Sequence, residues 1–225
     1  QEGAKQDAAR SRSYDKRLVE VRVAQNRSAE ALELCEKILK EDKNDAEAIA
    51  MRASLWLYAG KPDQINTAIS ELQSVVNKMQ DNFVLRYNLG RALMAKGDLD
   101  AARVQFQDAL KYRPDYLPAR IALAQVQVSR GEYAAAMSAA NEILQTDPGN
   151  QFARLIKSHA FMAQGKYDDS RGVLQETLKL YPGQSDAKYQ LGRVYFQEKK
   201  YKEAEALFQE IYSQKVPDMR GLMGL

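Results

Sequence analysis

The sequence predicts an all-helical protein built as a stack of similar helix pairs. Apolar residues recur at helical spacing throughout, and no segment alternates apolar and polar residues as a half-buried strand would. Glycine and proline recur with a common period of 34 residues, at Gly97, Gly131 and Gly165 and at Pro114, Pro148 and Pro182. A fixed period of this length indicates a supersecondary unit repeated along the chain.

The composition excludes several classes of protein. The 225 residues are 45% hydrophobic and 28% charged, as in an ordinary folded protein. The 33 basic and 30 acidic residues leave a net charge of +3, which is too balanced for a polyanion-binding surface. No apolar run approaches the roughly 18 residues that a membrane span needs, so we expect no direct membrane insertion. The single cysteine, Cys35, and the single histidine, His159, exclude an internal disulfide and a cysteine-based or multi-histidine metal site.

The 34-residue period divides most of the chain into six repeats, each with two helical patterns separated by a turn. They are residues 12–45, 46–82, 83–116, 117–150, 151–184 and 185–218. We expect residues 1–11 to be an N-terminal extension or the end of a preceding repeat, and residues 219–225 to start a further, truncated helix. The second repeat has three extra residues, which we place at 61–64, in the turn after Gly60, because loops tolerate insertions best.

A column of small residues stands midway along the first helix of the later repeats. Its members are Gly90, Ala124, Ser158 and Gly192, and they are expected to face Ala102, Ala136, Ser170 and Ala204 on the second helices. Glycine inside a helix costs roughly 1 kcal/mol relative to alanine, so its presence indicates close helix packing.

These columns resemble the tetratricopeptide repeat family. The residues that carry the resemblance in the third repeat are Tyr87-Asn-Leu-Gly90, Gly97, Ala102, Phe106, Ala109-Leu110 and Pro114. The similarity extends over residues 12–218, with departures at Asn26 and Lys199, which replace the turn glycine, at Val19 in the small column, and at Pro217, one place late. The resemblance implies a right-handed superhelical solenoid of antiparallel helix pairs, with the first helices lining a concave face that binds a protein or peptide partner.

The residues give no sign of an active site. Ser158 and His159 are adjacent on a helix, so their side chains point about 100° apart and cannot form a nucleophile–base pair. No GxxxxGK[ST] phosphate loop is present. Carboxylates such as Asp98 and Asp168 lie at the start of second helices, where they cap free N–H groups, and Cys35 occupies a core column. We therefore expect a protein that is not an enzyme and has no cofactor or metal.

Nucleic acid is not an expected partner. Arg12, Arg17, Arg22 and Arg27 recur every five residues, so they spiral around a helix rather than forming one basic stripe.

The candidate binding residues lie on the first helices, beside the core columns. They are Tyr87, Arg91, Met94, Ile121, Gln125, Phe152, Leu155, His159, Tyr189, Arg193 and Phe196. Aromatic residues and arginine dominate protein-binding hot spots, so we predict that this face is a peptide groove. A one-residue error in register would instead place some of them in the core.

One ligand class of the resembled family can be tested directly. Members that hold the acidic C-termini of heat-shock chaperones use a clamp of Lys, Asn and Arg on successive first helices. The matching positions here are Tyr87, Arg91, Ala122, Leu155 and His159. Only Arg91 is charged among them, so we do not expect a carboxylate-clamp chaperone ligand.

The leading hypothesis is a non-catalytic protein–protein interaction scaffold that binds a partner's peptide in the groove. Two alternatives are a structural spacer or assembly arm of a larger, possibly bacterial envelope or export, complex, and the regulatory module of a larger enzyme. No leader segment follows Gln1. The compartment stays open between a bacterial envelope-associated and a cytoplasmic scaffold.

Overall fold

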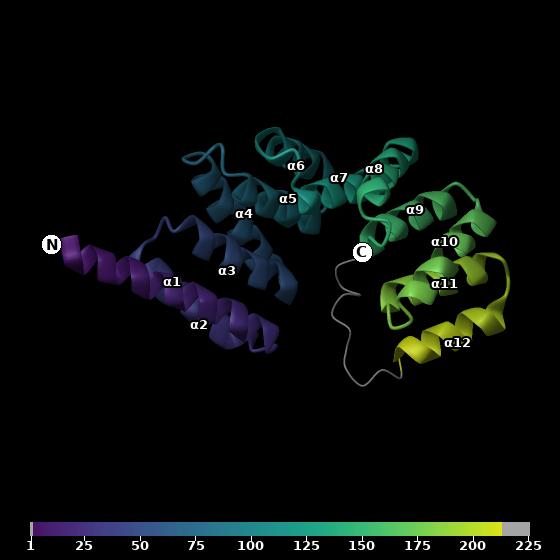
Figure 1. Ribbon diagram of the computed structural model, residues 1–225, viewed down its shortest axis with the longest axis horizontal. Helices are drawn as coiled ribbons and strands as arrows, with labels where there is room; N and C mark the ends of the chain where they lie inside the picture. Colours follow the sequence, from purple (N-terminus) through teal and green to yellow (C-terminus); the bar gives the residue numbers. More distant parts are fainter. Residues whose placement is uncertain (1, 213–225) are drawn as a thin grey trace. The chain divides into compact units, whose positions relative to one another are not determined.

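The computed structural model describes residues 2–212, and the side chains of residues 10–212. Within these residues the chain forms twelve α-helices and no strand (Figure 1). The helices are α1 (Glu2–Ala24), α2 (Ser28–Glu41), α3 (Ala46–Ala59), α4 (Pro62–Val76), α5 (Phe83–Lys96), α6 (Leu99–Tyr112), α7 (Leu117–Ser129), α8 (Tyr133–Thr146), α9 (Gln151–Ala163), α10 (Tyr167–Leu180), α11 (Ser185–Gln197) and α12 (Tyr201–Tyr212). None of the described helices is both long enough and apolar enough to cross a bilayer. The further helix expected at residues 219–225 lies outside the described residues.

The chain divides into two compact units, residues 1–119 and 120–225. In the first unit each helix packs against the next one along the chain, and α3 also packs against α5. In the second unit the same order holds from α8 to α12, and α9 also packs against α11. The first helices α3 and α5 of the first unit, and α9 and α11 of the second, therefore lie side by side.

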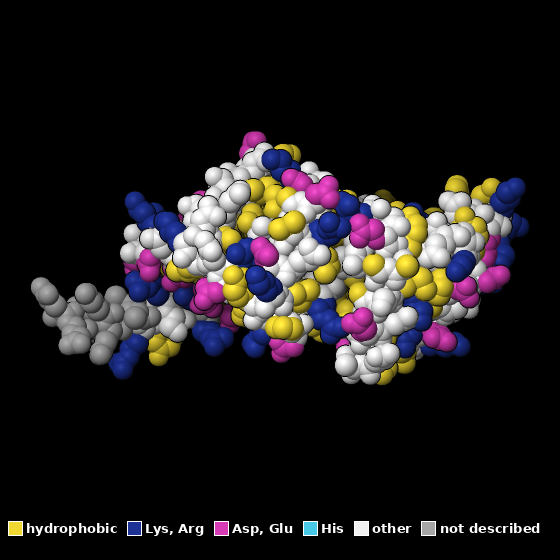
Figure 2. Space-filling view, turned by 90° about the horizontal axis from the view of Figure 1, so that it is seen from above, with side chains coloured by type: hydrophobic (Ala, Val, Ile, Leu, Met, Phe, Trp, Pro, Cys, Tyr) yellow, Lys and Arg dark blue, Asp and Glu magenta, His cyan; other side chains and the backbone are white. Residues whose placement is uncertain are grey.

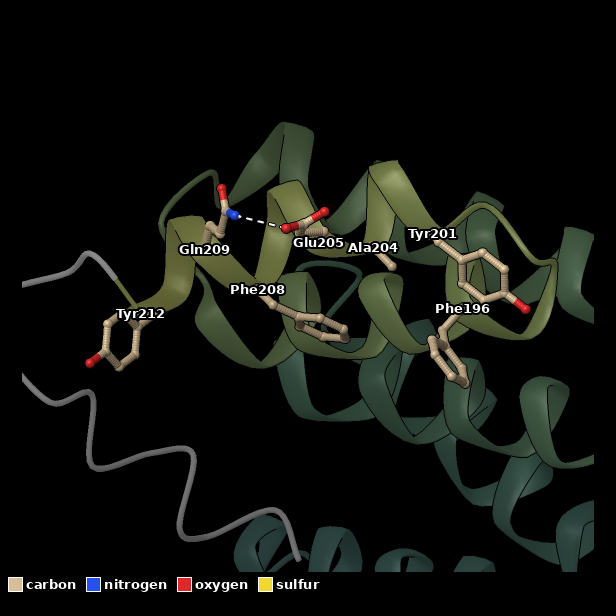
Figure 3. A pocket seen from close by; sticks show the side chains of 7 residues that line it. All are labelled: Phe196, Tyr201, Ala204, Glu205, Phe208, Gln209 and Tyr212. Atoms are coloured by element: carbon tan, nitrogen blue, oxygen red, sulfur yellow. Dashed lines mark hydrogen bonds between the residues drawn. The ribbon is translucent and has the colours of Figure 1, made fainter.

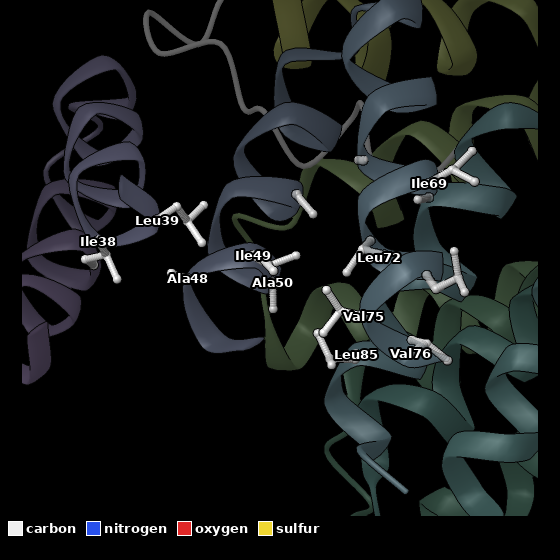
Figure 4. Packing of buried hydrophobic residues seen from close by; sticks show 14 residues of the cluster. Ile38, Leu39, Ala48, Ile49, Ala50, Ile69, Leu72, Val75, Val76 and Leu85 are labelled. Carbon is white, nitrogen blue, oxygen red and sulfur yellow. The ribbon is translucent and has the colours of Figure 1, made fainter. Parts of the chain in front are cut away.

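Small and branched apolar residues fill the space between the helices. In the first unit one core cluster spans Val19 to Leu55 and another runs from Ile38 to Ala92 (Figure 4). The second unit has two clusters, spanning Ala124 to Ala160 and Leu155 to Val194. Because each cluster joins neighbouring helix pairs, the core is continuous along a unit rather than concentrated at one centre.

The turn between the two helices of a pair has a left-handed residue in every repeat. These residues are Asn26, Gly60, Gly97, Gly131, Gly165 and Lys199, with φ between 58° and 89°. Glycine adopts this conformation freely, whereas a residue with a Cβ loses roughly 1 kcal/mol there. Asn26 and Lys199 thus replace glycine in sequence without changing the backbone of the turn.

The expected loop insertion in the second repeat is a helix extension instead. Pro62, Asp63 and Gln64 form the first turn of α4, which begins two residues after Gly60. Proline is well suited to the first helical position because its nitrogen has no hydrogen to leave unpaired. The extra residues therefore lengthen α4 at its start, and the buried Ala68 and Leu72 follow one turn later.

The column of small residues on the first helices lies close to the second helices. The second-helix residue nearest to each of its members is not always the predicted one. A Cβ added to Gly90 would lie 2.5 Å from Cε1 of Phe106, so this glycine makes room for the aromatic ring rather than for Ala102. Gly192 has the same relation to Phe208, at 2.6 Å. Ser158 does face its predicted partner, because its hydroxyl lies 3.0 Å from that of Ser170.

Candidate functional site

Three large aromatic side chains are exposed on neighbouring first helices of the second compact unit. Phe152 on α9 is 49% exposed, and Tyr189 and Phe196 on α11 are 43% and 56% exposed. α9 packs against α11, so the two helices present adjoining surfaces. The rings of Tyr189 and Phe196 also contact α12, with centroids 5.7 Å from Phe208 and 5.5 Å from Tyr201. We call the two adjoining surfaces together the α9–α11 face and define it by Phe152, His159, Tyr189, Arg193 and Phe196.

Two polar side chains lie among these aromatic residues. His159 on α9 and Arg193 on α11 are both half-buried. Burial lowers the pKa of His159, and the charge of Arg193 lowers it further, so the imidazole is neutral at neutral pH. Arg193 makes no hydrogen bond or ion pair with a described residue. The α9–α11 face therefore combines apolar surface with one uncompensated positive charge.

The other predicted residues of the second unit lie deeper. Ile121 and Gln125 on α7 are half-buried, and Ile121 packs against a core cluster of the unit. Leu155 is only 8% exposed and belongs to a core cluster with Leu174 and Leu191. Its prediction as a groove residue is wrong, because the rotation of α9 turns this position toward the core.

In the first unit, the predicted residues Tyr87, Arg91 and Met94 lie half-buried on α5. The ring of Tyr87 packs against two other rings, with centroids 5.9 Å from Phe106 and 5.4 Å from Tyr116. Tyr87 is thus partly a packing residue.

An apolar pocket of about 810 Å³ lies on α11 and α12 and was not predicted (Figure 3). Its walls include Phe196, Tyr201 and Phe208, and the ring centroids of Phe196 and Tyr201 are 5.5 Å apart. Sequence periodicity gave no signal for it, because a repeat pattern treats these positions as ordinary packing residues.

Comparison with known proteins agrees with this architecture. Tetratricopeptide repeat models match residues 93–158 and residues 157–219. The chain belongs to the tetratricopeptide repeat family. A search of the curated proteins gave no match.

Several solved structures have the same fold. A thermophilic tetratricopeptide repeat protein of Thermus thermophilus has a TM-score of 0.70 and 22% identity, over 82% of this chain and 99% of that one. A tetratricopeptide repeat protein of Parabacteroides merdae has a TM-score of 0.71 and 15% identity, over 96% and 85% of the two chains. MamA of Desulfovibrio magneticus has a TM-score of 0.57 and 19% identity, over 73% and 97%. These tetratricopeptide repeats make the chain a protein-interaction scaffold.

A repeating ion pair joins the two helices of each later tetratricopeptide repeat. A basic residue near the start of the first helix binds an acid 22 residues further on, in the pairs Arg86–Asp108, Arg120–Glu142, Arg154–Glu176 and Lys188–Glu210. The first three pairs have N–O distances of 2.8, 3.0 and 3.5 Å. We did not predict this column, although both of its members recur every 34 residues and could have been found in the sequence.

The other side chains that the sequence analysis considered for catalysis, those of Cys35, Ser158 and Asp98, lie in the core, bond to neighbouring side chains or cap a helix. Cys35 is fully buried, and burial raises the pKa of its thiol to about 11, so it does not form a reactive thiolate at neutral pH. The hydroxyl of Ser158 bonds to Ser170 and to Gln190. The carboxylate of Asp98 accepts the N–H of Ala101 and caps α6. Among residues 10–212, no group of three or more His, Cys, Asp and Glu side chains has the arrangement of a metal site.

Proposed function

We propose that this tetratricopeptide repeat protein is a non-catalytic scaffold that binds a peptide segment of a partner protein on the α9–α11 face. Apolar side chains of the peptide seat on Phe152, Tyr189 and Phe196. The observation that carries the proposal is the exposure of these three aromatic side chains on two adjacent first helices.

The physical reason is the cost of leaving such surface in water. Burial of a large apolar side chain is worth roughly 1.5–3 kcal/mol, and an exposed cluster of such side chains on a soluble protein marks an interaction site. Tyrosine and arginine are also enriched among residues whose truncation weakens binding most. Ile121 and Gln125 extend the proposed face on α7, whereas Tyr87, Arg91 and Met94 belong to a separate surface on α5.

A balanced surface charge supports a protein partner over a nucleic acid. Basic and acidic side chains alternate on the face drawn in Figure 2, without a broad region of one sign. Most basic side chains on the first helices are also neutralised, for example Arg120 by Glu142 and Arg154 by Glu176. A phosphate backbone would require a continuous positive track.

The test compares two triple variants with the parent. Peptides are first selected from a displayed random library on the parent chain, and their affinities are then measured by fluorescence polarisation. The test variant is Phe152→Ala/Tyr189→Ala/Phe196→Ala. The control is Val104→Ala/Tyr112→Ala/Leu180→Ala, which removes three comparably exposed apolar side chains from second helices.

We expect the test variant to lose at least about a hundredfold in affinity, since truncation of each of its three residues costs about 1 kcal/mol or more. The control should bind like the parent. Circular dichroism confirms that both variants remain helical. Equal affinity of parent and test variant, or equal losses in the two variants, would overturn the proposal.

A further inference from the structure

The first described helix, α1, exposes apolar side chains at positions that the other repeats bury. Tyr14 is 77% exposed, and Val21, seven residues later on the same side of the helix, is 46% exposed. The residues equivalent to Tyr14 in the other five repeats are at most 1% exposed, namely Ala48, Leu85, Ala119, Ala153 and Ala187. Those equivalent to Val21 are at most 9% exposed, namely Leu55, Ala92, Val126, Ala160 and Val194.

The second helix of the preceding repeat covers these positions elsewhere in the chain. Ala153 on α9 belongs to a core cluster with Ile143 of α8, and Ala187 on α11 belongs to one with Leu174 of α10. No second helix precedes α1 among the described residues. The exposed side of α1 is therefore one open half of an inter-repeat interface.

The apolar pocket on α11 and α12 is the other open half (Figure 3). No first helix follows α12 within residues 2–212, and Tyr201 and Tyr212 on the pocket wall are 57% and 93% exposed. The residues equivalent to Tyr212 in the two preceding repeats, Leu144 and Leu178, are half-buried and pack in core clusters with residues of the following first helix. The pocket thus lies where a following first helix packs in the other repeats.

The charges of the two open surfaces are complementary. Arg10 and Arg17 occupy exposed positions about one turn before and after Tyr14 on α1. Arg17 pairs only with the half-exposed Glu20 beside it, an ion pair that water screens. Glu205 is exposed on the pocket wall, and the glutamates of α12 outnumber its single lysine. Opposite charges favour the encounter of the two surfaces.

We infer that this protein associates head to tail, with the exposed side of α1 in one copy docked in the α11–α12 pocket of a second copy. A second copy fits because the chain itself carries both halves of the interface, and a first helix packs on the preceding second helix at α2–α3, α4–α5, α8–α9 and α10–α11. The contact joins two different surfaces, so each copy keeps one surface free for a further copy. Burial of the large apolar side chains drives the association.

The test follows the weight-average mass of the full chain by sedimentation equilibrium as its concentration rises. One variant, Tyr14→Ser/Val21→Ser, blocks the α1 surface, and another, Tyr201→Ser/Tyr212→Ser, blocks the pocket. We expect the mass of the parent to rise with concentration and each variant to associate at least about tenfold more weakly. Circular dichroism confirms that both variants remain helical.

Mixing the two variants tests the head-to-tail arrangement directly. Each variant keeps the surface that the other lacks, so an equimolar mixture should form a complex of two chains and nothing larger, although neither variant associates alone. The control Val104→Ser/Leu180→Ser changes two exposed apolar side chains on α6 and α10 and should associate like the parent. Raising the salt concentration from about 0.05 M to about 0.5 M should weaken the association of the parent.

Three results would overturn the inference. A parent mass of one chain up to about 1 mM would assign the two surfaces to other occupants, such as residues 213–225 or a partner protein. Undiminished association of either variant alone would indicate a symmetric contact through its unchanged helix. A mixture that stays monomeric would show that the two surfaces do not fit each other. The proposed peptide binding stands or falls separately, because both variants leave Phe152, Tyr189 and Phe196 unchanged.

Discussion

At the scale of single residues, the fold depends on matched volumes between the two helices of a pair. Gly90 faces Phe106 and Gly192 faces Phe208, whereas Ser158 faces the smaller Ser170. A family pattern specifies only that the first-helix position is small. The structure adds that glycine stands where the second helix carries a phenylalanine.

We predict that Gly90→Ala destabilises the protein by about 1–3 kcal/mol, because the added methyl group overlaps the ring of Phe106. The control is Gly172→Ala on α10, where an added Cβ meets nothing within 4 Å and should stabilise by about 0.5–1 kcal/mol. Urea unfolding measures both. Adding Phe106→Leu to Gly90→Ala should cost less than the sum of the two single changes. Additive costs would show that the ring is not the obstacle.

A second prediction at this scale concerns His159, the only histidine. Its pKa is lower in the folded protein than in the unfolded chain, so the unfolded chain binds the proton more readily. Its contribution to stability is therefore complete above the unfolded pKa of about 6.5 and is lost as the pH falls through the folded pKa. We expect the free energy of unfolding to fall between pH of about 7.5 and about 5.5, and His159→Gln to reduce that fall. An unchanged pH dependence in the variant would contradict this assignment.

At the scale of elements, the repeating ion pair connects the first helix of each later repeat to its second helix, and two of its basic residues, Arg86 and Arg154, also donate to a carbonyl of the preceding loop. Arg154 illustrates both roles, because it binds Glu176 and also donates from Nε and a terminal nitrogen to the carbonyl of Pro148, at 3.0 and 2.9 Å. The glutamate is 69% exposed, so the ion pair itself is screened by water. The bonds to the loop carbonyl need the planar fork of arginine.

We therefore predict that Arg154→Lys destabilises more than Glu176→Gln does. The lysine keeps the charge but loses the forked contact to Pro148, at a cost of about 1 kcal/mol. The glutamine variant removes only the exposed ion pair, at a cost below about 0.5 kcal/mol. Thermal unfolding of the two variants decides the order. A larger effect of Glu176→Gln would mean that charge pairing, rather than loop anchoring, is the main role of the column.

The periodicity of the sequence predicted the helix pairs and their turns well. It predicted poorly how each helix is rotated about its own axis and how far each helix extends. The 34-residue columns predict a helix pair per period and the turn between its members, including turns without glycine at Asn26 and Lys199. They do not tell whether inserted residues such as Pro62 lengthen a loop or a helix. They also do not separate Phe152 from Leu155, because a small rotation of α9 decides which of these neighbours faces water.

At the scale of the whole molecule, the family membership and the all-helical architecture followed from the sequence, whereas the binding surfaces needed the structure. Exposure of Phe152, Tyr189 and Phe196 depends on which helices cover them, and the exposure of Tyr14 depends on the absence of a second helix before α1 among the described residues. Neither property is encoded in a single repeat. Each arises from the packing of neighbouring repeats.

The most direct test of the proposed scaffold function is site-specific photocrosslinking to the native partner in the source cells. A photoreactive phenylalanine replaces Tyr189 on the α9–α11 face or, as the control, Val104 on α6, two positions of similar exposure. We predict that the chain with the probe at residue 189 crosslinks one partner protein through a defined peptide and that the probe at residue 104 does not. Crosslinks to the same partner from both positions, or from residue 104 alone, would contradict the assignment of binding to the first helices.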